Sequence, residues 1–153
     1  MSIFIGGTGS ANELDDYEEG EYTPSLSSGQ SLRSDFDRLK YTKIGRQVTL
    51  TGQLVFNQYN SSSYNVYFQI GLPFANGQLG GDRSDYVMAA GTGFFATSGS
   101  NSPNNNIQPM AFYITNGSSV ATVYGLHPNY DSTTGNWVGN GSDVWVNLTY
   151  FTD

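Results

Sequence analysis

Alternation of apolar and polar side chains along most of the chain is the feature that most limits its fold. In residues 46–56, RQVTLTGQLVF, one phase holds Val48, Leu50, Gly52, Leu54 and Phe56, and the other holds Gln47, Thr49, Thr51 and Gln53. A period of two places these two sets on opposite faces of a β-strand, because successive side chains of a strand point to opposite sides. The pattern therefore predicts a half-buried strand.

The same period recurs at intervals, separated by segments rich in Asn, Ser and Gly. The remaining predicted strands are residues 39–44, 64–70, 86–96, 107–114, 119–125 and 143–151. Asn116-Gly117, between two alternating runs, is the strongest hairpin signal. Strands with one apolar face need a second layer to cover it. We expect an all-β protein whose residues 22–153 form an antiparallel β-sandwich or jelly-roll head.

The first 21 residues lack this alternation. Ile3, Phe4 and Ile5 form an apolar tip, followed by the flexible stretch GGTGS and then by an acidic run. We expect residues 1–21 to be a flexible N-terminal arm whose tip packs on a neighbouring molecule and anchors the protein. A frayed terminus and a first strand on the protein's own sheet are the alternatives.

The charges are few and unevenly distributed. Charged residues make up 12% of the chain and the net charge is −7, which argues against binding to DNA or RNA because nucleic-acid binders need a basic surface. An acidic cluster precedes a group of bases, and the two sets attract each other within a subunit or between subunits. A solvated acidic linker is the alternative. The candidate inter-subunit residues are Asp15, Asp16, Glu18, Glu19, Arg33, Arg38, Lys40 and Arg46.

No pattern of catalytic or metal-ligating residues stands out. The chain has no cysteine and a single histidine, His127, which we interpret as a loop residue. The carboxylates of the acidic cluster are adjacent in sequence and lack the ligand order of a calcium loop, so a glycosidase pair or a calcium site is a weak alternative. We expect no enzyme activity, no cofactor and no bound metal. The N-terminus has no signal-peptide pattern, and no apolar run is long enough for membrane insertion.

Aromatic residues make up 14% of the chain, and several fall in loops or at the polar phase of strands. Such side chains stack on sugars or seal subunit interfaces. The candidate glycan contacts are Tyr130 and Trp137, and the wider set in these positions adds Tyr59, Tyr64, Tyr67 and Trp145.

Three segments resemble a module of tailed-bacteriophage virion proteins, especially those of marine and cyanobacterial phages. Residues 13–24, ELDDYEEGEYTP, are similar to its opening LDDYEEG-x-[WFY]-TP, with Tyr22 at the aromatic position. Residues 41–52, YTKIGRQVTLTG, resemble its Y-x-K-x-G-x-x-V-x-x-x-G strand pair, and residues 70–74, IGLPF, its I-x-LPF. Order and spacing agree over residues 7 to about 75.

The resemblance implies a β-sandwich head, commonly trimeric, at the end of a fibre or spike, and it does not imply an enzyme. In long fibres the module follows a shaft, whereas here it starts close to Met1. We therefore expect a capsid-decorating or capsid-fibre protein on the virion exterior, assembled in the bacterial host cytoplasm. Its expected partners are two further copies of itself and capsid or tail proteins. The alternative is a tail-fibre or receptor-binding adhesin head that recognises host-surface glycans.

Overall fold

The computed structural model describes residues 3–4, 13–14, 16–26, 30–59, 67–77, 87–96, 107–125 and 141–153, and these residues form strands and turns. Every strand pairing among them is antiparallel, which confirms the prediction of an all-β protein. The strands are β1 (Ile3–Phe4), β2 (Glu13–Leu14), β3 (Tyr17–Tyr22), β4 (Gln30–Leu32), β5 (Leu39–Ile44), β6 (Gln47–Tyr59), β7 (Tyr67–Gly71), β8 (Val87–Ala96), β9 (Ile107–Thr115), β10 (Val120–Gly125) and β11 (Asp143–Phe151).

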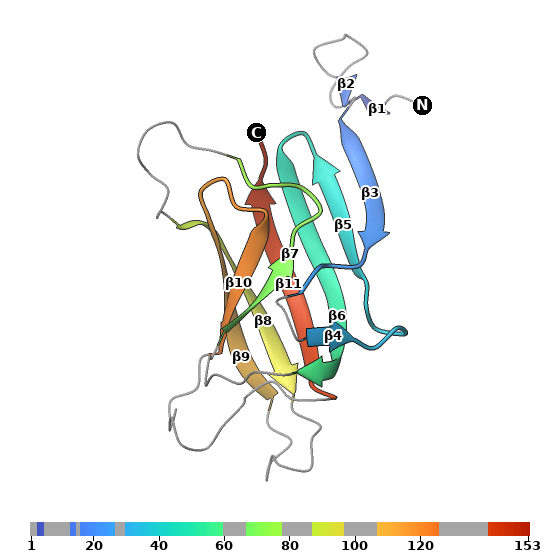
Figure 1. The fold of residues 1–153 in the computed structure, drawn as a ribbon. Coiled ribbons are helices and arrows are strands. Elements are labelled where there is room, and N and C mark those ends of the chain that lie inside the picture. The colour runs from blue at the N-terminus through green and yellow to red at the C-terminus, as the bar shows by residue number, and fades with distance from the viewer. Residues whose placement is uncertain are drawn as a thin grey trace.

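One large sheet makes up the body of the protein. Eight of its nine strands follow the order β3-β5-β6-β11-β8-β9-β10-β7, and the ninth, β4, pairs with the far end of β6. The sheet curls into a half-barrel, so that its two flanks turn toward each other (Figure 1). Strands β1 and β2 form a separate two-stranded sheet.

Contacts across the interior show how far the sheet curls. The rings of Phe56 in β6 and Phe68 in β7 meet edge to face with centroids 5.2 Å apart, although the four strands β11, β8, β9 and β10 separate β6 from β7 in the sheet order. Leu26 forms an isolated bridge with Ile70, and the Gly71 amide donates to the Ser25 carbonyl at 2.8 Å. The segment after β3 therefore reaches the opposite edge strand. A sandwich of two separate sheets, or a jelly roll, is not confirmed, because hydrogen bonds run continuously from β3 to β7.

The predicted alternation is confirmed in the two central strands. In β6 the side chains of Val48, Leu50, Leu54 and Phe56 are buried. In β11 they are joined by Val144, Val146, Leu148 and Tyr150, all on the concave face. Val55 is buried as well, although it belongs to the otherwise polar phase of β6. The segment before β5 lies along β6 there, since the Arg33 amide donates to the Val55 carbonyl and the Val55 amide to the Phe36 carbonyl.

Two glycines form the hairpin turns. The predicted Asn116-Gly117 turn joins β9 to β10, where the Ser118 amide donates to the Thr115 carbonyl at 3.1 Å and Gly117 has a φ of 67°. Gly45, with a φ of 57°, turns β5 into β6. Glycine suits both positions because other residues rarely adopt positive φ.

The predicted boundary of the arm at residue 21 falls inside a strand of the main sheet. Residues Tyr17–Tyr22 form β3, which pairs along its whole length with β5. Edge strands tolerate charged side chains, so an acidic run is compatible with a strand at the edge of a sheet. The main sheet therefore begins at Tyr17, and residues 17–21 belong to it and not to the arm. Among the described residues, no helix is long and apolar enough to cross a membrane.

Candidate interaction surface

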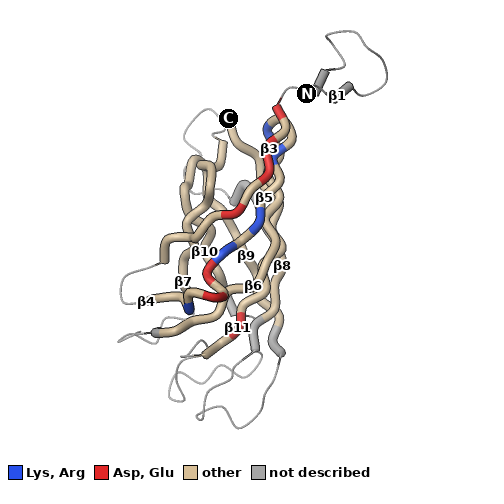
Figure 2. Tube along the Cα trace, turned by 90° about the vertical axis from the view of Figure 1, so that its right-hand side faces the viewer, with Lys and Arg blue, Asp and Glu red and all other residues tan. Residues whose placement is uncertain are grey.

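The acidic cluster and the bases meet on adjacent strands of one chain. The register of β3 against β5 places Glu18 opposite Lys43 and Glu21 opposite Lys40. Figure 2 shows the resulting band of both signs along these strands. Glu21 lies 3.8 Å from the Lys40 ammonium and 3.9 Å from the Arg38 guanidinium. Pairing within one subunit, which was one of the two arrangements expected, accounts for these side chains.

On the concave side of this band, Lys43 contacts a carboxylate and an aromatic ring. Its ammonium donates to both carboxylate oxygens of Asp16, at 2.7 and 2.9 Å, and lies 5.9 Å from the centre of the Phe74 ring. The Lys43 side chain is only 15% exposed. The Asp16 side chain is 54% exposed, so the pair lies at the surface while the Lys43 stem is covered. The pair holds the point where the N-terminal segment joins the sheet.

Aromatic rings continue this packing. Tyr41 contacts Tyr22 and Phe74 edge to face, with centroid distances of 6.3 and 5.3 Å. Gly20 lies opposite Tyr41, and a Cβ there would come within 2.9 Å of the Tyr41 hydroxyl oxygen, so the ring occupies space that only glycine leaves free. We call Asp16, Gly20, Tyr22, Tyr41, Lys43 and Phe74 the motif cluster, because the three motif segments each contribute to it.

Two tyrosine hydroxyls anchor the cluster to the backbone. Tyr22 donates to the Gly71 carbonyl at 3.1 Å, and Tyr150 of β11 donates to the Phe74 carbonyl at 2.9 Å. Burial raises the pKa of both phenols well above the ordinary value of tyrosine. The pKa of Tyr41 is also raised, because its hydroxyl donates to the ionised Glu18 carboxylate. All three groups stay neutral at physiological pH and act as hydrogen-bond donors.

The convex face of the same strands carries an exposed apolar row. The strand register aligns one residue from each of four adjacent strands: Tyr17 of β3, Ile44 of β5, Gln47 of β6 and Phe151 of β11. The three apolar members, Tyr17, Ile44 and Phe151, are 43%, 47% and 55% exposed. The row crosses the sheet at the end where β3 begins.

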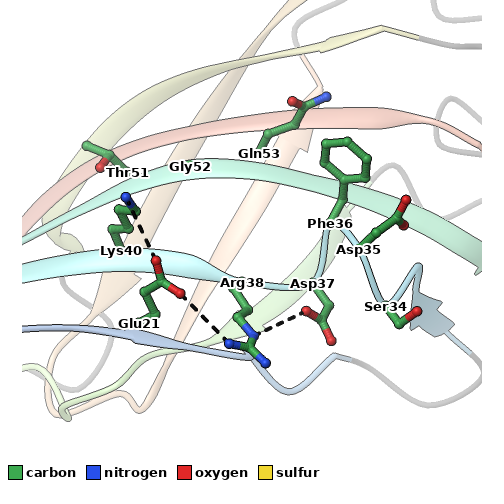
Figure 3. A pocket seen from close by; sticks show the side chains of 10 residues that line it. All are labelled: Glu21, Ser34, Asp35, Phe36, Asp37, Arg38, Lys40, Thr51, Gly52 and Gln53. Carbon is green, nitrogen blue, oxygen red and sulfur yellow. Dashed lines mark ion pairs between the residues drawn. The ribbon is translucent and has the colours of Figure 1, made fainter.

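Farther along the convex face lies a polar hollow of 510 Å³. Figure 3 shows a chain of ion pairs from Lys40 through Glu21 and Arg38 to Asp37 on one side, and Phe36 and Gln53 on the other. The Arg38 to Asp37 distance is 3.7 Å. We call this site the outer hollow. The lining residues are Glu21, Ser34, Asp35, Phe36, Asp37, Arg38, Lys40, Thr51, Gly52 and Gln53.

The outer hollow adjoins a pair of outward-facing aromatic residues. Gln53 of β6 lies opposite Trp145 of β11, which lies opposite Phe94 of β8, so all three share the convex face. Phe94 is 52% exposed and Trp145 is half-buried. We call Trp145 and Phe94 the aromatic platform. The sequence already placed Trp145 on the polar phase of its strand, but it did not single out Phe94. Of the residues that line the hollow, Arg38 and Lys40 were singled out, as candidate inter-subunit residues.

The other predicted site residues are partly placed. Ile3 and Phe4 form β1, whereas Ile5, Asp15, Tyr130, Trp137 and His127 lie outside the described residues. Arg33 pairs with Asp35 at 2.6 Å, and the hydrogen bond lowers the pKa of that carboxyl. Glu19 accepts from the Tyr17 hydroxyl at 2.6 Å. Arg46 donates to the Thr152 carbonyl at 2.7 Å and lies 4.0 Å from the Asp153 carboxylate.

Within the described part of the chain, no group of three or more His, Cys, Asp and Glu side chains is arranged to hold a metal ion. Comparisons of the chain with protein-family models, with curated proteins and with solved structures find no match.

Proposed function

We propose that this protein is a structural component of a tailed-bacteriophage virion, a capsid-decorating or capsid-fibre protein on the particle exterior. The observation that carries the proposal is the motif cluster. The segments that resemble the phage module lie up to about fifty residues apart in the sequence, yet Asp16, Tyr41 and Phe74 come from different segments and pack into one unit.

This convergence supports the resemblance on physical grounds. A chance similarity of three short segments gives no reason for their distinctive residues to contact each other. Here Gly20 makes room for the Tyr41 ring, Lys43 pairs with Asp16, and Gly45 forms the turn between the motif strands. The motif residues thus have structural roles, as expected for a module that supplies a stable body and not an active site.

The proposal assigns different tasks to the two parts of the chain. The N-terminal segment, with its apolar tip Ile3-Phe4-Ile5, attaches the protein to capsid or tail proteins, and the half-barrel is the exposed head. We propose a homotrimer assembled in the host cytoplasm, with the apolar row of Tyr17, Ile44 and Phe151 as a subunit contact. The acids and bases of β3 and β5 already pair within one chain, so they are weaker candidates for that contact.

The sandwich architecture implied by the resemblance also stays a proposal. The ring contact between Phe56 and Phe68 supports it, because it brings the two flanks of the curled sheet face to face. We propose neither an enzymatic activity nor a bound cofactor.

The experiment is incorporation into particles. Purified virions of a phage that encodes this chain are probed by immuno-electron microscopy with antibody raised against the recombinant protein. We expect labelling of the particle surface. A variant lacking residues 2–12 is then compared with the full chain for binding to stripped particles. It should keep the circular dichroism spectrum of the full chain and lose particle binding. Absence of the protein from virions would overturn the virion assignment, whereas full binding of the deletion variant would overturn attachment through the arm.

A further inference from the structure

The convex face of β5, β6, β11 and β8 combines the two chemistries that carbohydrate recognition requires. The outer hollow supplies hydrogen-bonding groups of both kinds: Glu21 and Asp37 accept, and Arg38 and Lys40 donate. The Gln53 amide nitrogen already donates to Asp143 at 3.1 Å, so Gln53 offers its carbonyl oxygen as a further acceptor. The aromatic platform supplies apolar ring surface in the adjoining row. A sugar ring has C–H groups on its faces and hydroxyls at its edge, so it needs both surfaces together.

The polar groups of the hollow are weakly committed to one another. Their charged atoms lie 3.7 to 3.9 Å apart, beyond hydrogen-bond distance, and the Arg38 and Lys40 side chains are 68% and 75% exposed. On the concave face, by contrast, Lys43 reaches Asp16 at 2.7 Å. Exposed pairs of this length are worth little, so a hydroxyl can enter between the partners at small cost.

Gly52 lines the hollow between Thr51 and Gln53. It adopts a φ of 149°, and a Cβ there would come within 2.9 Å of the buried Leu39 side chain, so packing against the core accounts for this glycine. Since adjacent strands lie about 5 Å apart, the distance from Lys40 on β5 across β6 and β11 to β8 is roughly 15 Å. This span suits an extended chain of several sugar units.

The balance of charge decides between ligand classes. The carboxylates of Glu21 and Asp37 balance the cations of Arg38 and Lys40, and Asp35 is paired with Arg33 at 2.6 Å. The hollow thus has no excess positive charge, which disfavours phosphate-rich ligands such as single-stranded nucleic acid. A purely apolar ligand would leave the polar groups desolvated without partners. A neutral polyhydroxylated ligand satisfies donors and acceptors alike.

We propose that the outer hollow and the aromatic platform form a saccharide-binding surface for neutral oligosaccharides. Phe94 and Trp145 stack on sugar rings, and Glu21, Arg38 and Gln53 bind their hydroxyls. The proposal goes beyond the virion assignment and does not depend on it, because it concerns the isolated chain.

The test uses the full-length recombinant protein on an array of neutral oligosaccharides, including cellotriose, maltotriose and chitotriose, with trigalacturonate as the acidic comparison. The saccharide with the strongest signal is then titrated by calorimetry. We expect millimolar or tighter binding to a neutral oligosaccharide and weaker binding to trigalacturonate. Absence of binding to every neutral member by the folded protein would overturn the proposal, and so would a preference for trigalacturonate.

Matched variants locate the site. Phe94→Ala should weaken binding roughly three- to tenfold through loss of ring contact, and Arg38→Ala roughly tenfold through loss of a charged donor. Arg46→Ala is the control, because the Arg46 side chain is 66% exposed, close to the 68% of Arg38, and does not line the hollow. It should bind as the wild type does. Equal losses in control and test variants would overturn the assignment. Concentration-dependent self-association abolished by Phe94→Ala would instead identify the face as a contact between copies, and it too would overturn the proposal.

Discussion

The motif cluster and the outer hollow are built from opposite faces of the same strands, yet they differ in how tightly their side chains are held. Strand β5 sends Tyr41 and Lys43 inward and Lys40 outward. The Lys43 side chain has a carboxylate that accepts through both oxygens and is 15% exposed, whereas the Lys40 side chain has one partner at 3.8 Å and is 75% exposed. Alternation along one strand thus separates residues that hold the fold from residues available to a ligand.

This difference follows from burial. On the concave face an unpaired charge or an empty space is costly, so each side chain of the motif cluster has a specific partner. On the convex face water competes with every contact, and ion pairs contribute little to the free energy of unfolding. Substitutions on the two faces should therefore affect different properties: stability on the concave face and binding on the convex face.

The largest expected contrast lies between neighbouring residues of β6. Leu50→Ala removes a fully buried side chain from the core and should lower the free energy of unfolding by about 2–5 kcal/mol. Thr51→Ala changes an exposed side chain at the rim of the outer hollow and should stay within about 0.5 kcal/mol. Urea denaturation followed by circular dichroism measures both values. Similar losses in the two variants would contradict the division between the faces.

A smaller effect is expected at the ion pair of the motif cluster. Asp16→Ala leaves the Lys43 ammonium without its carboxylate and should cost about 1 kcal/mol, because the pair is hydrogen-bonded but exposed. The double variant Asp16→Ala, Lys43→Met removes both partners and should recover much of that loss, because no unpaired ammonium remains. Glu19→Ala is the convex-face control, with a change of at most about 0.5 kcal/mol. A double variant less stable than Asp16→Ala would show that Lys43 is held by other groups.

The concave face was largely predictable from the sequence, and the reason is its local periodicity. Alternation in β6 and β11 identified Val48, Leu50, Val146 and Leu148 as core residues, since burial on one face leaves a period of two in the sequence itself. The interpretation of β3 as part of an arm failed because six of thirteen carboxylates lie within residues 13–21, and their density resembles a solvated linker. An edge strand with one solvated side accommodates the same residues.

The candidate sites were predicted less completely. Trp145 was visible as an aromatic residue on the polar phase of its strand, but its neighbour Phe94 depends on the register between β8 and β11. The position of Phe74 beside Lys43 likewise depends on a segment that returns to β5 from the other edge of the sheet. Such contacts arise from the curl of the whole sheet, which no local pattern encodes.

The smallest expected effect concerns pH and separates buried from exposed tyrosines. Burial raises the pKa of Tyr150 in the folded protein above the value of about 10 in the unfolded chain. Below pH 10 both states keep the proton, so this group gives no pH dependence. Above pH 10 the unfolded chain loses the proton first, and stability falls as the pH rises toward the folded-state pKa.

The Tyr150 contribution to this alkaline loss should be about 1 kcal/mol at pH 11. Tyr150→Phe is less stable at pH 7 because the hydrogen bond to the Phe74 carbonyl is lost, so the informative quantity is the change in unfolding free energy between pH 9 and pH 11. That change should be smaller in the variant than in the wild type. Tyr17→Phe removes an exposed phenol of the apolar row and should alter this pH-dependent change in unfolding free energy less than Tyr150→Phe does. If both variants showed the same decline as the wild type, the prediction would be wrong. The Tyr150 phenol would then ionise as readily in the folded protein as in water, despite its burial in the core.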